Sequence, residues 1–245
     1  MQHDMKTNDT AIRLNPGERC RWALALDRLS NTEVALINTK VRSRKYNTGE
    51  TVFIEGTPAE ELIIVSEGQI KCYMLSPSGN TFTPAIYGPD RLTGLLSALL
   101  EAPRMVTATT TRPSILGSIH ITDLHYLMSK IPIFSANMAK LAAAMASDLI
   151  WVLGQRAMMP ASVRLCHALI ALGQRRPLAD WPNALVVQGL SQEDLAGFIG
   201  ASRTWVSHTL GELEQAGFIW RDRKEIGVYE PERLSHEADS MLLGL

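Results

Sequence analysis

The chain has 245 residues, of which 46% are hydrophobic and 20% are charged, and its formal net charge is −1. This length is sufficient for two modest domains with separate cores, and the near-neutral charge excludes a protein that coats nucleic acid through bulk positive charge. The N-terminus lacks the basic-then-apolar order of a signal peptide, and no apolar run approaches the roughly 20 residues that cross a bilayer. We therefore expect a cytoplasmic protein without a membrane partner.

The three cysteines, Cys20, Cys72 and Cys166, are widely separated and odd in number. They form neither a CxxC metal-binding pair nor a disulfide framework, and they suit a reducing cytoplasm. We expect each thiol to pack as a small buried hydrophobe. The sequence therefore predicts no metal site and no cofactor.

The residue pattern of the first half of the chain changes twice. Residues 1–16 are polar, and we expect a flexible N-terminus there, whereas residues 17–39 carry apolar side chains at helical spacing. From residue 41 short β-rich runs alternate with glycines, which indicates an antiparallel sandwich or roll within a domain that extends over 17–131. The expected strands are Thr51–Ile54, Leu62–Val65, Ile70–Leu75, Thr81–Tyr87, Val106–Thr111 and Ser114–Ile119.

A long helix is expected over residues 132–158, because Pro132 suits a helix start and no proline follows until Pro160. Its apolar side chains recur at alternating steps of four and three, which is typical of a coiled-coil seam and predicts a dimerisation helix. The alternative is that the helix packs only against its own β-roll. The residues of the predicted dimer interface are Met138, Ala142, Met145, Leu149 and Val152.

The C-terminal part begins where Met158-Met159-Pro160-Ala161 breaks the long helix. We expect a hinge over 159–161, a domain over 162–234 that opens with a helix to Leu172, and a tail over 235–245.

Within that domain, residues 190–219 predict two short helices joined by a tight turn. Ser191 can cap the first helix, and Asp194 lies where a capping box places its acid. Gly200 can end this helix and Ser202 can cap the next one. The pattern indicates a helix-turn-helix.

The second helix has an apolar inner face, formed by Val206, Leu210 and Leu213, and a polar outer face in its first turns. Such a helix fits the major groove of DNA. A β-hairpin with a charged turn follows over residues 218–229, as in a winged helix-turn-helix. A helix pair alone occurs in many all-helical proteins, but cap, turn, outer face and wing in this order favour DNA binding.

Acidic residues outnumber basic ones over residues 191–235. The basic side chains of this region can therefore bind phosphates only if they are positioned at the DNA-facing surface, because total charge does not favour binding. The predicted base readers are Arg203, Thr204, Ser207 and His208. We expect Gln192 and Ser202 to contact phosphates. The wing turn contributes Arg221, Arg223 and Lys224.

The segments LSQEDLAGFIGASRTWVSHTL and GETVFIEGTPAEELIIVSEGQIKCYM resemble the Crp/Fnr superfamily of bacterial transcription regulators, and the resemblance covers roughly residues 30–233. The resemblance implies an α+β fold with a cyclic-nucleotide-binding-type β-roll (a double-stranded β-helix or jelly roll), a long dimerisation helix and a C-terminal winged helix-turn-helix. It also implies a homodimer on a two-fold symmetric DNA operator, a small-molecule effector between roll and long helix, and contact with RNA polymerase through residues 175–183.

The implied effector pocket departs from family members that bind cyclic nucleotides. Gly94 is followed by Leu95 instead of a ribose-binding carboxylate, and Met105 replaces a serine next to Arg104, which matches the phosphate-binding arginine. We predict no response to cyclic AMP, because each lost buried hydrogen bond costs about 1–3 kcal/mol. The expected pocket residues are Leu92, Gly94, Leu95, Leu96, Arg104, Met105, Trp151 and Val152.

An apolar wall with one cation suits an aromatic or fatty carboxylate. The alternatives are that Arg104 forms a structural salt bridge, that the pocket is collapsed, and that the roll is a protein-interaction module without an effector. Cys20 stands alone where an iron–sulfur regulator needs several cysteines, and Leu95 stands where a haem sensor needs histidine.

The resemblance also bears on DNA reading and on catalysis. Thr204 and His208 replace a glutamate and an arginine that family members use after the arginine matched by Arg203, which predicts a non-standard half-site. Ser207 matches a serine of the fumarate–nitrate branch. An enzyme of the cupin type is not expected, because residues 41–119 contain no histidine, and we predict no catalytic residues.

Overall fold

The computed structural model describes residues 21–223 and 225–243, which divide into two compact units between Ile150 and Trp151. We call residues 21–150 the N-terminal unit and residues 151–243 the C-terminal unit. The division falls inside helix α6 (Pro132–Met158), ahead of the predicted hinge over 159–161, where α6 ends and α7 (Ala161–Leu172) begins.

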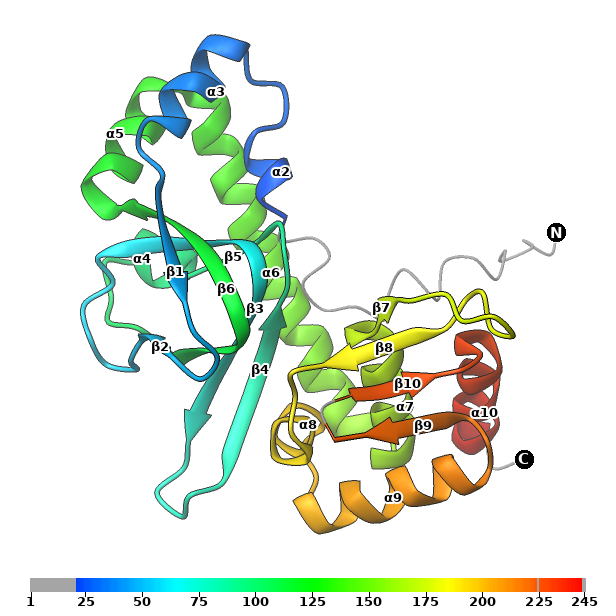
Figure 1. Cartoon of the computed structure of the whole chain (residues 1–245). Helices are drawn as coiled ribbons and strands as arrows, with labels where there is room; N and C mark the ends of the chain where they lie inside the picture. The colour runs from blue at the N-terminus through cyan, green and yellow to red at the C-terminus, as the bar shows by residue number, and fades with distance from the viewer. Residues whose placement is uncertain (1–20, 224, 244–245) are drawn as a thin grey trace, which may run out of the picture. The chain divides into compact units, whose positions relative to one another are not determined.

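The N-terminal unit is built on a six-stranded antiparallel sheet in which β1, β6, β3 and β4 lie side by side, with β2 paired to β6 and β5 paired to β3 (Figure 1). A mixed fold of helices and sheet with this roll was predicted, and it is confirmed. The strands are β1 (Arg42–Tyr46), β2 (Thr51–Phe53), β3 (Glu61–Leu75), β4 (Thr81–Tyr87), β5 (Arg91–Thr93) and β6 (Thr107–His120).

Two of these strands are longer than expected, since β3 and β6 each join two predicted runs. Gly68 explains why β3 bends instead of ending: its φ is +87°, and a Cβ there would collide with Ser114 and the Pro113 carbonyl of β6. Strand β1 was not expected because its sequence, RSRKY, has no apolar alternation, and four of its side chains are exposed. It is held by pairing with β6.

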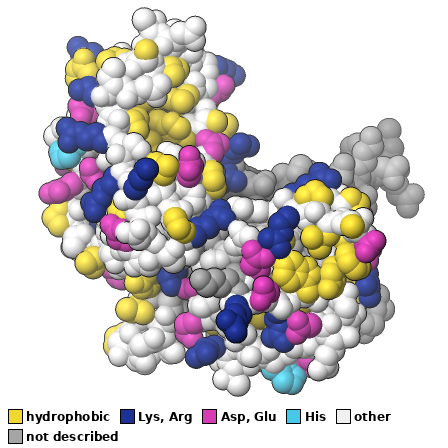
Figure 2. Space-filling model, in the orientation of Figure 1, with side chains coloured by type: hydrophobic (Ala, Val, Ile, Leu, Met, Phe, Trp, Pro, Cys, Tyr) yellow, Lys and Arg dark blue, Asp and Glu magenta, His cyan; other side chains and the backbone are white. Residues whose placement is uncertain are grey.

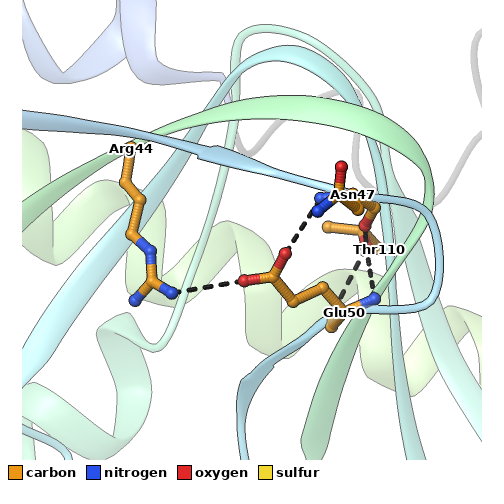
Figure 3. Close-up of polar contacts among 4 residues, drawn as sticks. All are labelled: Arg44, Asn47, Glu50 and Thr110. Atoms are coloured by element: carbon orange, nitrogen blue, oxygen red, sulfur yellow. Dashed lines mark hydrogen bonds and ion pairs between the residues drawn. The ribbon is translucent and has the colours of Figure 1, made fainter.

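The turn between β1 and β2 is fixed to β6 by a polar network (Figure 3). The Glu50 carboxylate accepts hydrogen bonds from Arg44 Nη2 (3.2 Å) and from the Asn47 backbone N–H (3.0 Å). The Glu50 backbone N–H donates to Thr110 Oγ1 (3.0 Å), which donates to the Asn47 carbonyl (2.5 Å). Thr110 is buried, so its two bonds satisfy a hydroxyl group that water cannot reach, whereas the bonds to the Glu50 carboxylate are exposed.

Helices cover the roll and complete the core of the N-terminal unit. Phe134, Met138 and Leu141 of α6 pack with Leu92, Leu95 and other fully buried side chains into one cluster. A second cluster fills the roll interior around Val65, Ile70 and Cys72. The helices are α2 (Trp22–Ala25), α3 (Asn31–Asn38), α4 (Leu95–Leu99), α5 (Ile121–Lys130) and the first part of α6.

Helix α6 is long and apolar enough to cross a membrane by its length and composition, so the expectation that no segment meets this criterion was wrong. One helix of this kind is weak evidence for a membrane span, because the core helix of a soluble protein passes the same test. In the N-terminal half of α6, Phe134 and Met138 are fully buried, so this part of the helix packs into the core of its unit.

The C-terminal unit surrounds a four-stranded sheet in the order β7-β8-β10-β9 (Figure 1). Only the β9–β10 hairpin was predicted. Instead of the tail expected from residue 235, the structure has helix α10, whose Leu234 and Ala238 are fully buried in the core with α7 side chains. The elements are α7, β7 (Gln174–Arg175), β8 (Leu185–Gln188), α8 (Gln192–Ile199), α9 (Arg203–Gln215), β9 (Ile219–Asp222), β10 (Glu225–Val228) and α10 (Pro231–Leu243).

The described cysteines pack as predicted. Cys72 and Cys166 are buried and free, and burial raises the pKa of their thiols to about 11 and about 12. Cys20 lies outside the described residues.

Candidate DNA-binding and effector sites

The predicted caps of the helix-turn-helix are present. Ser191 Oγ accepts a hydrogen bond from the Asp194 backbone N–H (3.1 Å), and the Asp194 carboxylate accepts one from the Ser191 backbone N–H (2.9 Å). Helix α8 ends at Gly200, whose φ of +73° is left-handed and therefore suits glycine. Ser202 Oγ caps α9 by accepting from the Trp205 backbone N–H (3.2 Å). These local bonds fix where both helices begin and where the first one ends.

Helix α9 presents the two faces that its sequence predicts. Val206, Leu210 and Leu213 are buried in the core of the C-terminal unit. The opposite face of the first two turns is exposed and carries the predicted contact residues. Exposed side chains on or directly before this face are Ser202, Arg203, Thr204, Ser207 and His208, whereas Gln192 on α8 is half-buried.

An acidic residue that the sequence reasoning missed lies beside this face. His208 Nδ1 is 3.4 Å from Glu212 Oε2, four residues further along α9, and both side chains are exposed. On the visible side of the C-terminal unit, basic and acidic side chains alternate without a continuous basic patch (Figure 2). On this side, attraction to phosphates therefore depends on single, well-placed cations.

The wing differs from the prediction at Arg221. Its guanidinium donates to Glu214 on α9, with Nε at 2.9 Å and Nη2 at 2.5 Å from Oε2, and its backbone N–H donates to Oε1. These bonds hold the pKa of the Glu214 carboxyl below its ordinary value. Arg221 thus anchors the hairpin to α9, and its predicted contact with DNA stays a prediction. Arg223 is exposed, and Lys224 lies outside the described residues.

In the effector region, the predicted pocket residues differ in how deeply they are buried. Leu92 and Leu95 are fully buried in the hydrophobic core, Leu96 is half-buried, and Met105 is exposed. The expectation that Leu92 and Leu95 line an open pocket is therefore wrong for this structure. Gly94 precedes α4 with φ +85°, and a Cβ at this position would collide with Nη1 of Arg104.

Arg104 points into the roll and is only 5% exposed. Its Nη2 donates to the Glu61 carbonyl (2.6 Å), and its guanidinium lies 4.2 Å from the centre of the Phe53 ring. Within residues 21–223 and 225–243, Nε and Nη1 are buried without a hydrogen-bond partner. Burial lowers the pKa of this guanidinium. A buried cation with two open donors is the arrangement that an anionic ligand would complete.

Comparison with known proteins agrees with this combination of units. Residues 43–130 match the sequence model of the cyclic nucleotide-binding domain, and residues 163–237 match that of the Crp-like helix-turn-helix domain. The chain belongs to the Crp/Fnr superfamily. It is a DNA-binding transcription regulator of the Crp/Fnr type and not an enzyme.

Relatives of this Crp/Fnr regulator include the CRP-like cAMP-activated global transcriptional regulator of Mycobacterium tuberculosis, which is 26% identical over 84% of this chain and 92% of that protein. The cyclic AMP receptor protein of Thermus thermophilus is 26% identical over 78% of this chain and 85% of its own. Among solved structures, FixK2 from Bradyrhizobium japonicum aligns with a TM-score of 0.66 and 20% identity, covering 80% of this chain and 96% of that one.

The predicted dimerisation seam of this Crp/Fnr regulator is only partly exposed. Met138 is fully buried in the core of its own unit and is corrected from an interface residue to a core residue, while Ala142 and Met145 pack against the same core. Leu149 is 41% exposed and the adjacent Ile150, which was not predicted, is 71% exposed. Val152 is buried and, with Trp151, lines a recess inside the C-terminal unit.

Two arginines near the helix-turn-helix have a role that the sequence did not indicate. Arg156 Nη2 donates to the carbonyls of Gly197 (2.6 Å) and Phe198 (2.9 Å) in the last turn of α8. Arg164 Nε donates to the Ile199 carbonyl (2.7 Å), and its Nη1 donates to the Met159 carbonyl next to the hinge. Both cations satisfy carbonyls at a helix C-terminus, where positive charge is favourable. We call Arg156 and Arg164 the arginine clamp.

Proposed function

We propose that this regulator is a cytoplasmic homodimer whose DNA binding is gated by a small-molecule effector other than cyclic AMP, bound in the β-roll beside Arg104. The observation that carries this proposal is the buried Arg104 guanidinium, whose Nε and Nη1 have no hydrogen-bond partner among the described residues. An anion placed there would gain charge-assisted hydrogen bonds and would offset the cost of burying the cation.

Cyclic AMP fits this roll poorly. Leu95 is fully buried in the core where a ribose-binding carboxylate would be needed, and Met105 provides no hydroxyl beside Arg104. Each unpaired buried polar group costs about 1–3 kcal/mol, so two or three such losses weaken binding by orders of magnitude. The Phe53 ring beside Arg104 favours an aromatic or fatty carboxylate, whose carboxylate meets the guanidinium.

We further propose that two copies associate through α6 and read a two-fold symmetric operator, with residues 159–161 as the hinge. Leu149 and Ile150 in the N-terminal unit, and Leu153 and Met158 in the C-terminal unit, are large apolar side chains left exposed on this helix. Exposed apolar surface of this kind is typical of an association face. The proposed RNA polymerase contact lies on residues 175–183.

On the DNA side, we propose that Arg203 contacts guanine or a phosphate and that Thr204, Ser207 and His208 read base edges. The support is that all four are exposed on the outer face of α9. Phosphate contacts are assigned to Gln192, Ser202 and Arg223.

Isothermal titration of the purified protein tests the effector. We expect no heat with cyclic AMP at millimolar concentration, and binding of at least one member of a panel of aromatic and fatty carboxylates that Arg104→Gln weakens at least tenfold. Micromolar binding of cyclic AMP would overturn the proposed effector class. Native mass spectrometry of the same sample reports the dimer and any retained ligand, and a monomer at micromolar concentration would contradict the dimer.

A second candidate is an effector-independent regulator whose roll is a protein-interaction module. The complete burial of Leu92 and Leu95 favours it, because these side chains fill space that an effector would need. No binding across the panel, together with equal operator affinity of wild type and Arg104→Gln, would decide for this candidate.

A further inference from the structure

A small recess that is partly open to solvent lies within the C-terminal unit between the end of α6, α7 and α8. Most of its wall is apolar, with Trp151 and Val152 from α6 and Phe198 and Ile199 from α8. Apolar walls that include the aromatic side chains of Trp151 and Phe198 suit an aromatic ligand. The recess contains no residue of the β-roll, so it is separate from the proposed effector site at Arg104.

A buried polar side chain lies among these apolar walls. His167 on α7 lines the recess and is only 7% exposed, and its Nδ1 has no hydrogen-bond partner within the part of the chain that the structure describes. Burial lowers the pKa of this imidazole more than the charge of Asp239 raises it, so the ring is neutral at neutral pH. A neutral imidazole with an open nitrogen can form one hydrogen bond to a ligand.

The recess is also electropositive. Both members of the arginine clamp, Arg156 and Arg164, line it, and none of the described residues that line it is acidic. The two guanidiniums are close enough for the charge of Arg164 to lower the pKa of Arg156, in addition to the larger effect of burial. An anionic group would relieve this repulsion, and it would do so in partly buried surroundings where charges interact more strongly than in water.

We propose that this recess is a second ligand site, which binds a small aromatic anion with its ring against Trp151 and Phe198 and its charged end toward Arg164 and His167. The site touches α8, the first helix of the helix-turn-helix, through Phe198 and Ile199. A ligand bound there stabilises the packing of α8 on α7, because it binds only the folded unit.

Isothermal titration with naphthalene-2-carboxylate tests the proposal, with naphthalene-2-carboxamide as the uncharged counterpart. We expect the carboxylate to bind at least tenfold more tightly than the amide, and His167→Phe to weaken its binding about tenfold. His236→Gln is the matched control, since His236 is an exposed histidine of the same unit outside the recess. Arg104→Gln should leave this binding unchanged, which separates the recess from the proposed effector site. Equal affinities of carboxylate and amide, or equal binding by wild type and His167→Phe, would overturn the proposal.

A second measurement uses the wild-type protein, so it does not depend on a variant folding. In methyl-labelled protein, the Ile199 methyl signal, assigned with Ile199→Val, should shift on addition of naphthalene-2-carboxylate, while the Ile64 signal in the N-terminal core should not. A shift of Ile64 without a shift of Ile199 would place the probe in the roll and overturn the recess as a ligand site, as would the absence of any shift at millimolar probe.

Discussion

Replacing Arg164 with methionine tests whether the arginine clamp holds the helix-turn-helix against the hinge. Arg164 donates to the Ile199 carbonyl at 2.7 Å, to the Gly200 carbonyl at 3.4 Å and to the Met159 carbonyl. Hydrogen bonds from a charged donor contribute about 1.5–3 kcal/mol each, and a cation at a helix C-terminus adds about 0.3–1 kcal/mol.

Arg164 is only partly buried, so water can replace some of these partners, and the net effect falls well below the sum of these contributions. Methionine retains an apolar stem, which limits the loss of packing. We therefore expect Arg164→Met to lower the free energy of unfolding of the C-terminal unit by about 2–3 kcal/mol.

Urea unfolding of the full chain, followed by far-UV circular dichroism and tryptophan fluorescence, measures this change. Arg223→Met is the matched control, because Arg223 is exposed and no side-chain hydrogen bond or ion pair is present for it among the described residues. The control should stay within about 0.5 kcal/mol of wild type, as is usual for surface substitutions. An Arg164→Met protein as stable as this control would refute the clamp.

Three further predictions follow from single sites. Arg203→Ala should weaken operator binding by about 1–3 kcal/mol in a gel-shift titration, and unchanged affinity would contradict the docking of α9. Gly68→Ala should lower stability by about 2–4 kcal/mol, because φ is +87° and the new methyl group would meet Ser114; an unchanged melting temperature would refute this. Burial raises the pKa of Cys72 from 9.0 to about 11, so the folded state should lose stability as pH rises from 9 to 11, by about 1.4 kcal/mol per pH unit. Cys72→Ala should lack this component of the pH dependence, and identical pH profiles would exclude it.

The parts of the fold that the sequence predicted are those set by local bonds. The capping box at Ser191, the left-handed Gly200 and the inward face of α9 each depend on residues within four positions of one another. Such features can be predicted from the sequence because capping and helical periodicity involve residues that are close together in the chain.

The parts that could not be predicted depend on pairing between distant segments. Strand β1 has a charged sequence, and it forms because its backbone pairs with that of β6. Strand β3 continues past Gly68 because it pairs with β6 on both sides of this residue, with shifts of register around it. Helix α10 was mistaken for a tail, although Pro231 at its start and the helical spacing of Leu234 and Ala238 are local signals that could have indicated it. Its packing against α7 is seen only in the folded unit. Tertiary context decides such elements.

The same distinction explains which side-chain positions could be predicted from the sequence. The sequence placed Arg203 on an exposed face because helical periodicity alone decides its direction, and the structure shows it exposed. The sequence could not show that Arg221 donates to Glu214, or that Arg156 and Arg164 donate to carbonyls of α8. The hydrogen-bond partners of a long side chain depend on which groups the folded unit brings near it. For Arg104 the sequence supplied part of the description, because its motif suggested a contact with a ligand. The structure adds that the guanidinium is buried and that its Nε and Nη1 have no hydrogen-bond partner among the described residues.

These assignments bear on how a chain with net charge −1 can hold DNA. Arg221 is paired with Glu214 and Glu212 lies beside His208, so Arg203 and Arg223 are the exposed arginines among the predicted contacts that the structure describes. Each phosphate contact contributes a slope of about −0.9 to the logarithmic salt dependence of DNA affinity, so few cations imply a shallow slope. With the proposed docking of α9 and the proposed dimer, affinity at physiological salt then comes mainly from base-edge contacts of α9 and from two recognition helices presented at once. A fixed orientation of α8 and α9 matters more under these conditions than total charge, and the bonds that the arginine clamp and the Arg221–Glu214 pair make are of the kind that fix it.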